Sequence, residues 1–530
     1  MSLNPERKHR FSNSKEKALW QKGDRLFLSK ITVVGVLIVV QLVLFIYAIW
    51  MLGGYRTYFE IGYTILSVVV VIYIINKKEN PAYKLAWTIL ILLFPLFGGA
   101  FYLIVAGNRA SAHFIRKIQA GIADSCKLLT QEESVKGDLK AHSRSAAMQS
   151  EYIEKFGPYP VYQKTKVDYY AFGEDNYEPM LEALRSAKRF IFLEYFIIRE
   201  GCFWNEVLAI LEAKVKEGID VRVLYDDFGC VATIPANYDR YLREKGIQCY
   251  SFNHFIPVLT LRLNNRDHRK IAVIDGYIGF TGGINIADEY INLTHPYGRW
   301  KDTGVKLVGA AVYSMTVMFL QLWEYVTGTV EDYAGYTALP EILDAIEDDG
   351  FVQPYSDSPL DQETLGGNIY LNMINRARKS ILIITPYLVL NHEMITALAL
   401  ASKSGVNVKI IIPGIPDKKI VYSLTKTNAR ILMEEGVRIY EYVPGFTHAK
   451  VVLVDDEIAA VGTVNMDYRS LYLHFECGVW MYQTECMQEI RRDFDHTLTE
   501  CRELSLFEYQ NESWIKRMWQ ALLQLFAPLL

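Results

Sequence analysis

The sequence is poor in the features that mark zinc-binding and disulfide-stabilised proteins. Its seven cysteines, an odd number in 530 residues, include no C-x-x-C pair. They stand at positions 126, 202, 230, 249, 477, 486 and 501. This scatter argues against both a zinc site and a disulfide framework. We interpret the cysteines as free thiols.

An excess of charge of either sign is also lacking. The formal net charge is only −4, so the chain has no overall basic field that would draw it to nucleic acid. A cleaved signal peptide is not expected, because a long polar stretch precedes the first apolar segment and no small-residue cleavage pattern follows it.

Hydrophobic residues are abundant, at 51% of the chain, and they are concentrated near the N-terminus. A basic tail over 1–30 precedes three apolar segments, at 31–52, 58–76 and 85–106. We predict that these segments are transmembrane helices, because about 20 apolar residues cross a bilayer. The expected location is therefore a cell membrane, with the chain crossing it several times.

The topology of these segments has alternatives. Lysines and arginines place the tail and the second loop in the cytoplasm. Pro95 and the Gly98-Gly99 pair allow the third segment to be either a kinked span or a re-entrant hairpin. Three full spans put the bulk of the protein outside, whereas a re-entrant third segment keeps it inside.

Beyond a polar connector at 107–150, strand-like and helix-like segments alternate and the order repeats. "SAKRFIFLEYFII" at 186–198 matches "RARKSILIITPYLVL" at 376–390 in its basic start and apolar run. This rhythm predicts an α/β protein with two duplicated sandwich halves, at 151–330 and 361–505, joined by a linker at 331–360. Each half is expected to hold a largely parallel sheet.

The C-terminal segment 506–530 is expected to form a helix. Trp514 and Trp519 recur near helical spacing on an apolar face, beside Lys516 and Arg517. The helix is predicted either to lie at a membrane interface or to pack on the rest of the protein.

The strongest signal is a polar pattern that occurs twice. "DHRKIAVIDGYIGFTGGIN" (267–285) and "THAKVVLVDDEIAAVGTVN" (447–465) share five identities at a constant separation of 180 residues. The pairs are His268 and His448, Lys270 and Lys450, Asp275 and Asp455, Gly282 and Gly462, and Asn285 and Asn465. A single His-x-Lys is usually a polar strand end at the surface. A second copy at the same spacing favours a function.

Alternate side chains of a strand share a face, so each histidine points the same way as its lysine. Two halves packed about a pseudo-two-fold axis would bring both pairs to one cleft, which would attract an anion. Phosphoryl chemistry fits this set. One neutral histidine can attack phosphorus and the other can protonate the leaving oxygen, while fixed donors bind the phosphate oxygens. The candidate donors are Lys270, Lys450, Asn285 and Asn465.

The repeated pattern resembles the HxKxxxxD motif of the phospholipase D superfamily. The resemblance implies two halves that form one catalytic unit without a metal or other cofactor, and a mainly structural role for Asp275 and Asp455. It also implies that an acidic residue downstream of each motif orients a histidine. Asp302 and Glu476 are the matching positions, with ordinary surface acids as the alternative.

Within the superfamily the chain is similar to the bacterial cardiolipin synthases over nearly its whole length. "KLAWTILILLFPLFGGAFYLIVAG" resembles the family's membrane hairpin and "FAPLL" its C-terminal end, whereas 31–52 is an additional segment. The resemblance implies that two phosphatidylglycerol molecules are joined into cardiolipin at a membrane bilayer, with release of glycerol. It assigns His268 as nucleophile and His448 as general acid, roles that the sequence also allows to be exchanged.

Two other functions use the same motifs. A hydrolytic phospholipase D would share every catalytic residue and release phosphatidic acid. A membrane-tethered nuclease would need a basic groove with stacking aromatics, which the charge balance does not support. The sequence leaves open the donor lipid, the membrane face and the oligomeric state, a homo-oligomer included.

Overall fold

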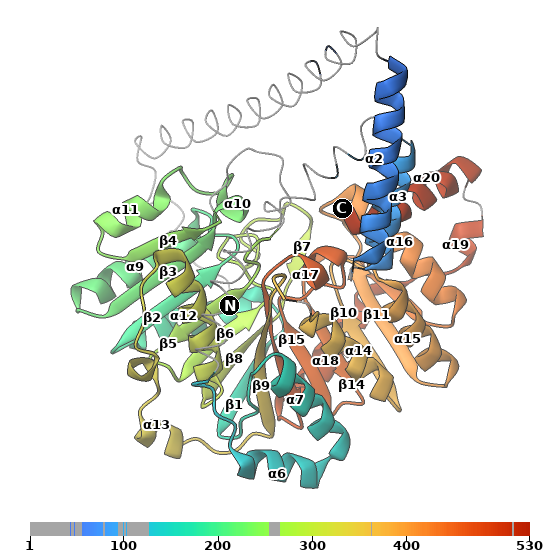
Figure 1. The fold of residues 1–530 in the computed structure, drawn as a ribbon. Coiled ribbons are helices and arrows are strands. Elements are labelled where there is room, and N and C mark those ends of the chain that lie inside the picture. The colour runs from blue at the N-terminus through green and yellow to red at the C-terminus, as the bar shows by residue number, and fades with distance from the viewer. Residues whose placement is uncertain are drawn as a thin grey trace.

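The computed structural model describes residues 56–77, 80–93, 127–253, 265–361, 363–510 and 513–529, together with residues 43, 47, 99 and 102. Two α/β units lie side by side, one coloured green to yellow and the other orange to red in Figure 1. The duplication predicted from the sequence is confirmed, because the two units repeat the same order of strands around the two motifs.

The first half is built on a seven-stranded sheet in the order β1-β8-β6-β5-β2-β3-β4. Its strands are β1 (Thr165–Tyr170), β2 (Phe190–Tyr195), β3 (Asp220–Asp226), β4 (Gln248–Phe252), β5 (Lys270–Ile274), β6 (Ile278–Gly282) and β8 (Gly304–Gly309). Alternate residues of β2 serve two cores: Phe190 and Phe192 face the second half, whereas Ile191 and Leu193 face the helices on the outer side. A strand covered on both faces must be apolar throughout, as β2 and β5 nearly are.

Helices cover this sheet on both faces. The elements are α8 (Gly173–Ser186), α9 (Cys202–Lys216), α10 (Asp227–Cys230), α11 (Tyr238–Glu244), α12 (Val312–Thr327), η4 (Tyr333–Tyr336) and α13 (Pro340–Asp344). The helix α12 packs on β4 and β5 of the first sheet and also contacts a strand of the second. Phe319 of this helix stacks on Phe192, with ring centroids 4.5 Å apart.

The second half repeats the plan with eight strands in the order β17-β12-β11-β10-β14-β15-β16-β9. The strands are β9 (Phe351–Asp357), β10 (Ser380–Ile384), β11 (Asn407–Pro413), β12 (Arg438–Tyr442), β14 (Val451–Val454), β15 (Ile458–Gly462), β16 (Glu476–Tyr482) and β17 (Cys501–Glu503). Its helices are α14 (Leu365–Arg376), α15 (His392–Lys403), α16 (Lys419–Glu434), α17 (Tyr468–Tyr472) and α18 (Cys486–Thr499). Because β9 pairs along its length with β16, this sheet begins inside the segment 331–360 that the sequence suggested as a linker.

The expectation of largely parallel sheets is wrong. Only β2-β3-β4 and the matching β10-β11-β12 run parallel, and the other neighbours are antiparallel. The reason lies in the motifs, since β5 and β6, like β14 and β15, are joined by tight turns that reverse the chain. The alternation of parallel strands and helices therefore extends over part of each half and ends where each motif begins.

The two halves are joined by one core and by direct strand contacts. A single cluster of buried hydrophobic residues contains side chains of both sheets, among them Phe192, Val273, Val452 and Trp480. The short strands β7 (Arg299–Lys301) and β13 (Gly445–Thr447) pair across the boundary in parallel. Both sheets thus bury their inner faces against each other, which brings the two motifs together.

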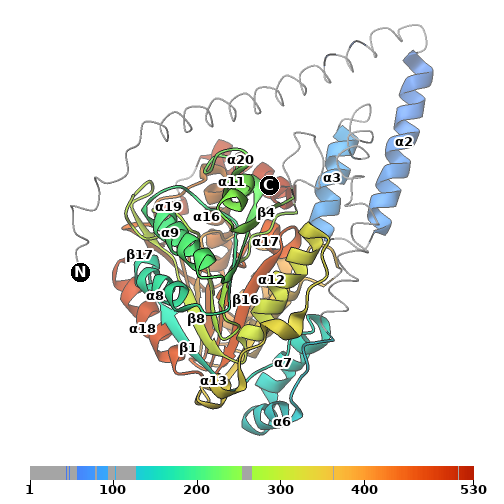
Figure 2. The same ribbon diagram turned by 90° about the vertical axis from the view of Figure 1, so that its left-hand side faces the viewer.

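Further helices lie at opposite ends of the molecule (Figure 2). At one end, α6 (Glu133–His142) and α7 (Arg144–Phe156) lie partly in the expected connector. At the other end are α2 (Arg56–Asn76) and α3 (Pro81–Leu93). The helix α3 contacts α20 (Trp514–Phe526), and the short helix η5 (Ala527–Leu529) follows α20. The short α19 (Phe507–Gln510) precedes them in the C-terminal segment.

In the part of the chain that the structure describes, no helix combines the length and apolar character that a bilayer span needs. The expected span 58–76 coincides with α2, so its assignment as a transmembrane helix is not supported. The expected segment 31–52 falls almost entirely outside the described residues, whereas the first part of 85–106 belongs to α3 and most of the rest lies outside them.

Candidate active site

Each motif histidine lies just before its strand and is fixed by the backbone of the other half. The amide of His268, ahead of β5, donates to the carbonyl of Phe475 at 2.9 Å. In the same way the amide of His448, ahead of β14, donates to the carbonyl of Lys301 at 2.6 Å. The position of each histidine therefore depends on the docking of the two halves.

The carboxylates that hold the imidazoles are exchanged between the halves as well. Nδ1 of His268 lies 3.0 and 2.9 Å from the two oxygens of Glu476, and Nδ1 of His448 lies 2.7 Å from Oδ2 of Asp302. Both acids are fully buried, which excludes the alternative of ordinary surface acids. An ionised carboxylate only accepts hydrogen bonds, so Glu476 favours the His268 tautomer whose Nε2 carries a free lone pair.

The two carboxylates are supported differently. The Thr463 hydroxyl donates to Glu476, and this residue occupies the place of Gly283 in the first half. A Cβ atom at Gly283 would lie 2.0 Å from Oδ1 of Asp302, so only glycine leaves room for that carboxylate. The backbone amide of Thr303 donates to the same oxygen at 2.8 Å.

Both motif lysines are buried beside the histidines. Nζ of Lys270 donates to the carbonyl of His268 at 2.6 Å, and Nζ of Lys450 donates to the carbonyl of His448. Burial lowers the pKa of Lys270 to about 8, although Glu476 opposes the shift. Burial likewise lowers the pKa of Lys450 to about 7, against the effect of Asp302. The site thus holds two ammonium groups that lack the solvation they would have in water.

The two imidazoles are held in the neutral form. Burial lowers the pKa of His268 well below its usual range, although Glu476 opposes this. Burial, with Lys450 and Lys270 acting in the same direction, lowers the pKa of His448. Burial raises the pKa of Asp302 to about 7 despite Lys450, whereas the pKa of Glu476 stays low because His268 and His474 outweigh its burial.

The motif aspartates lie at the far ends of the strands, roughly 20 Å of extended chain from the histidines. Asp275 accepts three backbone hydrogen bonds, from the amides of Lys188, Arg189 and Phe190 at 2.7 to 2.9 Å. Asp455 accepts the equivalent three, from Arg378, Lys379 and Ser380. Each aspartate thus ties the end of a motif strand to the start of its neighbour.

The two asparagines are buried close to the histidines but have partners in the fold. Asn285 accepts from the amide of Ile197 and donates to the Tyr290 hydroxyl at 2.7 Å. Asn465 donates to the Ser470 hydroxyl at 3.0 Å. Their amide groups therefore hold the loops after β6 and β15 in place, and a phosphate would have to share them.

Aromatic rings that the sequence analysis did not identify surround both imidazoles. Phe196 stands edge-on to His268 at 5.0 Å, and Tyr290, Trp300 and Phe446 lie 5.6 to 5.8 Å from His448. These residues lie outside the repeated pattern. Only Trp300 could have been suspected from the sequence, because it stands two residues before Asp302. They exclude water from the rings.

One further group includes donor atoms of a kind that metals bind. Atoms of His268, His474 and Glu476 lie within 4.8 Å of one another. Contacts between imidazoles and a shared carboxylate account for this arrangement, and we assign no metal to it. The expected independence from metal stays a prediction.

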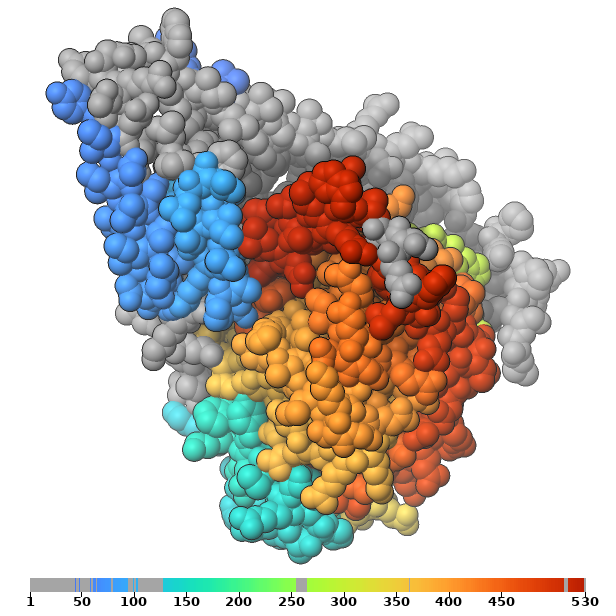
Figure 3. All heavy atoms as spheres, turned by 90° about the vertical axis from the view of Figure 1, so that its right-hand side faces the viewer, coloured from blue at the N-terminus to red at the C-terminus, as the bar shows by residue number. Residues whose placement is uncertain are grey.

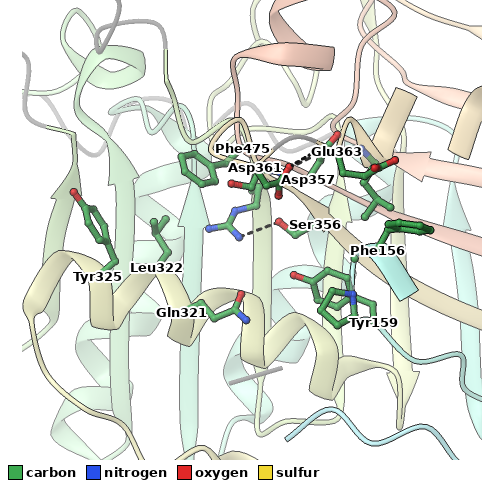
Figure 4. A pocket seen from close by; sticks show the side chains of 15 residues that line it. Phe156, Tyr159, Gln321, Leu322, Tyr325, Ser356, Asp357, Asp361, Glu363 and Phe475 are labelled. Carbon is green, nitrogen blue, oxygen red and sulfur yellow. Dashed lines mark hydrogen bonds between the residues drawn. The ribbon is translucent and has the colours of Figure 1, made fainter. Parts of the chain in front are cut away.

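A separate pocket of about 100 Å³, partly open to solvent, lies between α12 and the start of α14. Figure 4 shows Tyr325 and Leu322 on one side and Asp357 and Glu363 on the other. Asp357 accepts from the first amides of α14, and Glu363 is bonded to neighbouring side chains. These carboxylates serve the fold, so the paired motifs are the better candidate site.

Comparisons with known proteins agree with this geometry. The family model described as "Cardiolipin synthase, PLD-like domain" matches residues 180–300 and 370–498, one stretch in each half, and a "Phospholipase_D-nuclease N-terminal" model matches residues 65–107. The crystal structure of phosphatidylserine synthase from Haemophilus influenzae has a TM-score of 0.52 and 16% identity, covering 72% of this chain and 98% of its own, which shows the fold. The chain is thus a phospholipase D-like protein of two halves.

Relatives define the family more narrowly. Cardiolipin synthase of Alkalihalophilus pseudofirmus is 33% identical over 91% of this chain and 95% of its own length. The cardiolipin synthase of Halalkalibacterium halodurans is 32% identical with the same coverage. An uncharacterised protein of Streptococcus mutans is 43% identical over 87% of this chain and 99% of its own. This chain belongs to the cardiolipin synthase family.

Replacing Asp275 or Asp455 is expected to reduce stability. Alanine would leave three backbone amides without acceptors at a residue with positive φ, at a cost of about 2 to 4 kcal/mol in the free energy of unfolding. Asparagine keeps one acceptor oxygen and tolerates the backbone, so it should cost less. Urea unfolding of both variants measures the difference. An alanine variant as stable as the wild type but inactive would instead indicate a direct chemical role.

Affinity for an anion is expected to fall as pH rises from about 7 to about 9. Lys450 and Lys270, with pKa values of about 7 and 8, lose their charge in this interval, and each lost cation weakens the attraction. The inhibition constant of inorganic phosphate should rise roughly tenfold. Lys450→Arg, which stays charged, should show a flatter dependence. An inhibition constant unchanged up to pH 9 would contradict this view of the site.

Proposed function

We propose that this protein is a cardiolipin synthase that transfers a phosphatidyl group from one phosphatidylglycerol to another, giving cardiolipin and glycerol. Membership of the family supports the reaction. The observation that carries the mechanism is the buried pair of imidazoles, each bonded to a carboxylate of the other half. Their burial, their free Nε2 atoms and the two adjacent ammonium groups suit attack on a phosphodiester.

In the first step, Nε2 of His268 attacks phosphorus of the first lipid. A nitrogen–phosphorus bond forms, the bond from phosphorus to the glycerol headgroup oxygen breaks, and His448 gives that oxygen a proton. The phosphorylated ring carries a positive charge, which ionised Glu476 stabilises through Nδ1. The nucleophile His268 is thus held by Glu476, and the acid His448 is held by Asp302.

The general acid must gain a proton before it can give one. Before a lipid binds, burial and the two lysines favour the neutral form of His448 by lowering its pKa. A phosphodiester brings a negative charge that offsets Lys450 and Lys270, and this raises the affinity of the imidazole for a proton. Substrate binding therefore prepares the acid, and protonation is coupled to the presence of the anion.

In the second step, the terminal hydroxyl of a second phosphatidylglycerol attacks the phosphohistidine. Now neutral His448 removes the proton of this hydroxyl, an oxygen–phosphorus bond forms and the bond to His268 breaks. His268 is then neutral again, and His448 is protonated as it was with the first lipid bound. His448 loses this proton when the anionic product leaves, because burial and the lysines again lower its pKa. Lys270 uses one of its three ammonium hydrogens on a histidine carbonyl, and Lys450 contacts both the carbonyl and Nδ1 of His448, so each retains a hydrogen for a phosphate oxygen. Asn285 and Asn465 assist from the loops beside them.

Association with a bilayer would bring a lipid hydroxyl, rather than water, to the intermediate. The C-terminal helix α20 packs its inner face on Leu424 and Val389. Its outer face exposes Trp514, Ile515, Met518, Trp519 and Leu522 beside Lys516 and Arg517. The packing of one side and the exposed apolar residues of the other support a helix that contacts lipid with its outer face.

The same side of the molecule carries more apolar surface. In Figure 3, α3 and α20 lie side by side, with α2 next to α3. The outer residues of α2 are apolar and exposed, among them Ile61, Ile65, Val69 and Ile72. A contiguous surface of this kind fits a membrane interface. Multi-pass insertion through 31–52 and 85–106 stays a prediction, since 31–52 and much of 85–106 lie outside the described residues.

A lipid substrate with a good leaving group separates the two histidine roles. A phosphatidyl ester of p-nitrophenol needs no proton to release its phenolate, so His448→Ala should keep much of the first step whereas His268→Ala should lose at least about a thousandfold. The burst of p-nitrophenolate measures the step. Rescue of the His268 variant instead of the His448 variant would exchange the two roles.

Transfer and hydrolysis differ in their products. Purified protein in phosphatidylglycerol vesicles without added metal should yield cardiolipin and an equimolar amount of glycerol, and His448→Ala should yield neither. Lipid chromatography with a glycerol assay measures both. Phosphatidic acid as the main product would assign the protein to the hydrolytic phospholipases D, with the same histidine chemistry.

Replacement of Trp514 and Trp519 by alanine should weaken binding to anionic vesicles. Each exposed indole withdrawn from lipid is worth about 1.5 to 3 kcal/mol, so the double variant should bind at least about tenfold less tightly in flotation experiments. The matched control is Val330→Ala, an exposed apolar residue between α12 and η4. Equal loss in the control, or no loss in the double variant, would exclude α20 as the lipid contact.

A further inference from the structure

The two halves differ in the ring that stands two residues before each active-site carboxylate. Trp300 precedes Asp302, and His474 precedes Glu476. The Trp300 ring lies 5.6 Å from the ring of His448, and the His474 ring lies 5.4 Å from the ring of His268. Equivalent positions thus hold an indole beside one motif histidine and a third imidazole beside the other.

His474 shares its carboxylate with the first motif histidine. Its Nδ1 lies 3.5 Å from Oε1 of Glu476, and both oxygens of that carboxylate lie within 3.0 Å of Nδ1 of His268. The side chain of His474 is only 11% exposed, and its backbone amide is held by the carbonyl of Arg469 at 3.0 Å. The ring is therefore part of a fixed arrangement in which one buried carboxylate faces two imidazoles.

An indole and an imidazole differ in one respect that bears on a carboxylate. Indole is a hydrogen-bond donor that never changes charge, whereas imidazole gains a positive charge in the range of pH 5 to 8. Trp300 consequently presents the same group to Asp302 at every pH. A protonated imidazole in the place of His474, 3.5 Å from the carboxylate, would compete with His268 for the single negative charge.

We propose that His474 is a positioning residue that makes the His268–Glu476 pair sensitive to pH. As a neutral ring, it steadies the carboxylate that orients His268. As a cation, it draws the charge of Glu476 away from His268. The proposal deepens the proposed function and rests on it in one respect, the assignment of His268 as the attacking group.

The effect on the reaction follows from the charge of the intermediate. His268 becomes positive when it bonds to phosphorus, and Glu476 is the anion that stabilises this charge. With His474 protonated, the same anion serves two cations and stabilises each of them less. Formation of the phosphohistidine therefore slows on the acid side of the optimum.

Other charged groups around this carboxylate also act on it and have to be kept constant in a test. They belong to the two motifs, and they are His268, Lys270 and Lys450. Substitutions at position 474 leave all of them in place. Comparison of variants at this position, rather than the profile of the wild type alone, isolates the contribution of His474.

The experiment follows the release of p-nitrophenolate from a phosphatidyl ester of p-nitrophenol between pH 4.5 and 9, in His474→Gln, His474→Trp and wild-type protein. Glutamine donates a hydrogen bond without titrating, and tryptophan reproduces the other half. In both variants the acid limb of kcat should move down by about one pH unit, the size of effect expected from one adjacent charge. The matched control is Trp300→Phe, which alters the equivalent ring without changing charge and should leave the acid limb where it is.

An acid limb that does not move in the variants that fold, as judged by their melting curves, would overturn the proposal even if kcat falls. So would an equal movement in Trp300→Phe, because the effect would not be specific to the imidazole. Release of p-nitrophenolate does not depend on which acceptor completes the reaction. A protein that yields phosphatidic acid instead of cardiolipin would therefore refute the synthase function while leaving the role of His474 open to the same measurement.

Discussion

The active site depends on a crossed attachment of the two halves. Each motif histidine is anchored through its backbone amide to the opposite half, and its imidazole is held by the opposite half's carboxylate. Neither half alone could orient its histidine or exclude water from it. The shared hydrophobic core, which includes side chains from the inner faces of both sheets, supplies the energy that keeps these contacts closed. Folding of the core and assembly of the site are thus one event.

This arrangement concentrates costly groups in one place. Two ammonium groups, two carboxylates and two imidazoles are nearly inaccessible to water, and burial shifts the pKa of most of them towards the neutral form. Ion pairs in such surroundings contribute little net stability. Their use lies in preorganisation, because donors that already point at the phosphate need no rearrangement when charge develops on its oxygens. The remote motif aspartates, bonded to backbone amides, help to hold the strands that carry these groups.

The sequence predicted the duplication and the meeting of the two His-x-Lys pairs, because identical spacing in two similar segments implies identical local structure. It could not predict that Asp302 would hold His448 and Glu476 would hold His268, since the distance along the chain says nothing about which half a side chain faces. The sheets were expected to be largely parallel because helices separate the early strands. The motifs reverse the chain through short turns, a local feature that overrides the earlier rhythm. The aromatic rings around the imidazoles were missed because packing partners leave no pattern in a single sequence.

Beneath their common plan, the halves differ in what lies behind each motif strand. Arg269 is buried with Glu194 and Asp267, at 2.7 and 3.1 Å, next to the first histidine. The register of the sheets matches these three residues with Ile384, Thr447 and Ala449 in the second half, where no such charges occur.

A duplicated protein with two identical chemical roles would gain nothing from such differences. Two unlike roles require them, because a nucleophile must hold a covalently bound phosphate in a fixed direction while an acid must exchange its proton with each substrate. The ion-paired arginine and the Thr463 hydroxyl restrain the first motif and its carboxylate. Beside the second imidazole, Gly283 leaves room for Asp302, and Nζ of Lys450 lies 2.8 Å from Nδ1 of His448, so this ring has a cation next to it. In the proposed mechanism, the divergence of the supports, more than the motifs themselves, suits one histidine to attack and the other to proton transfer.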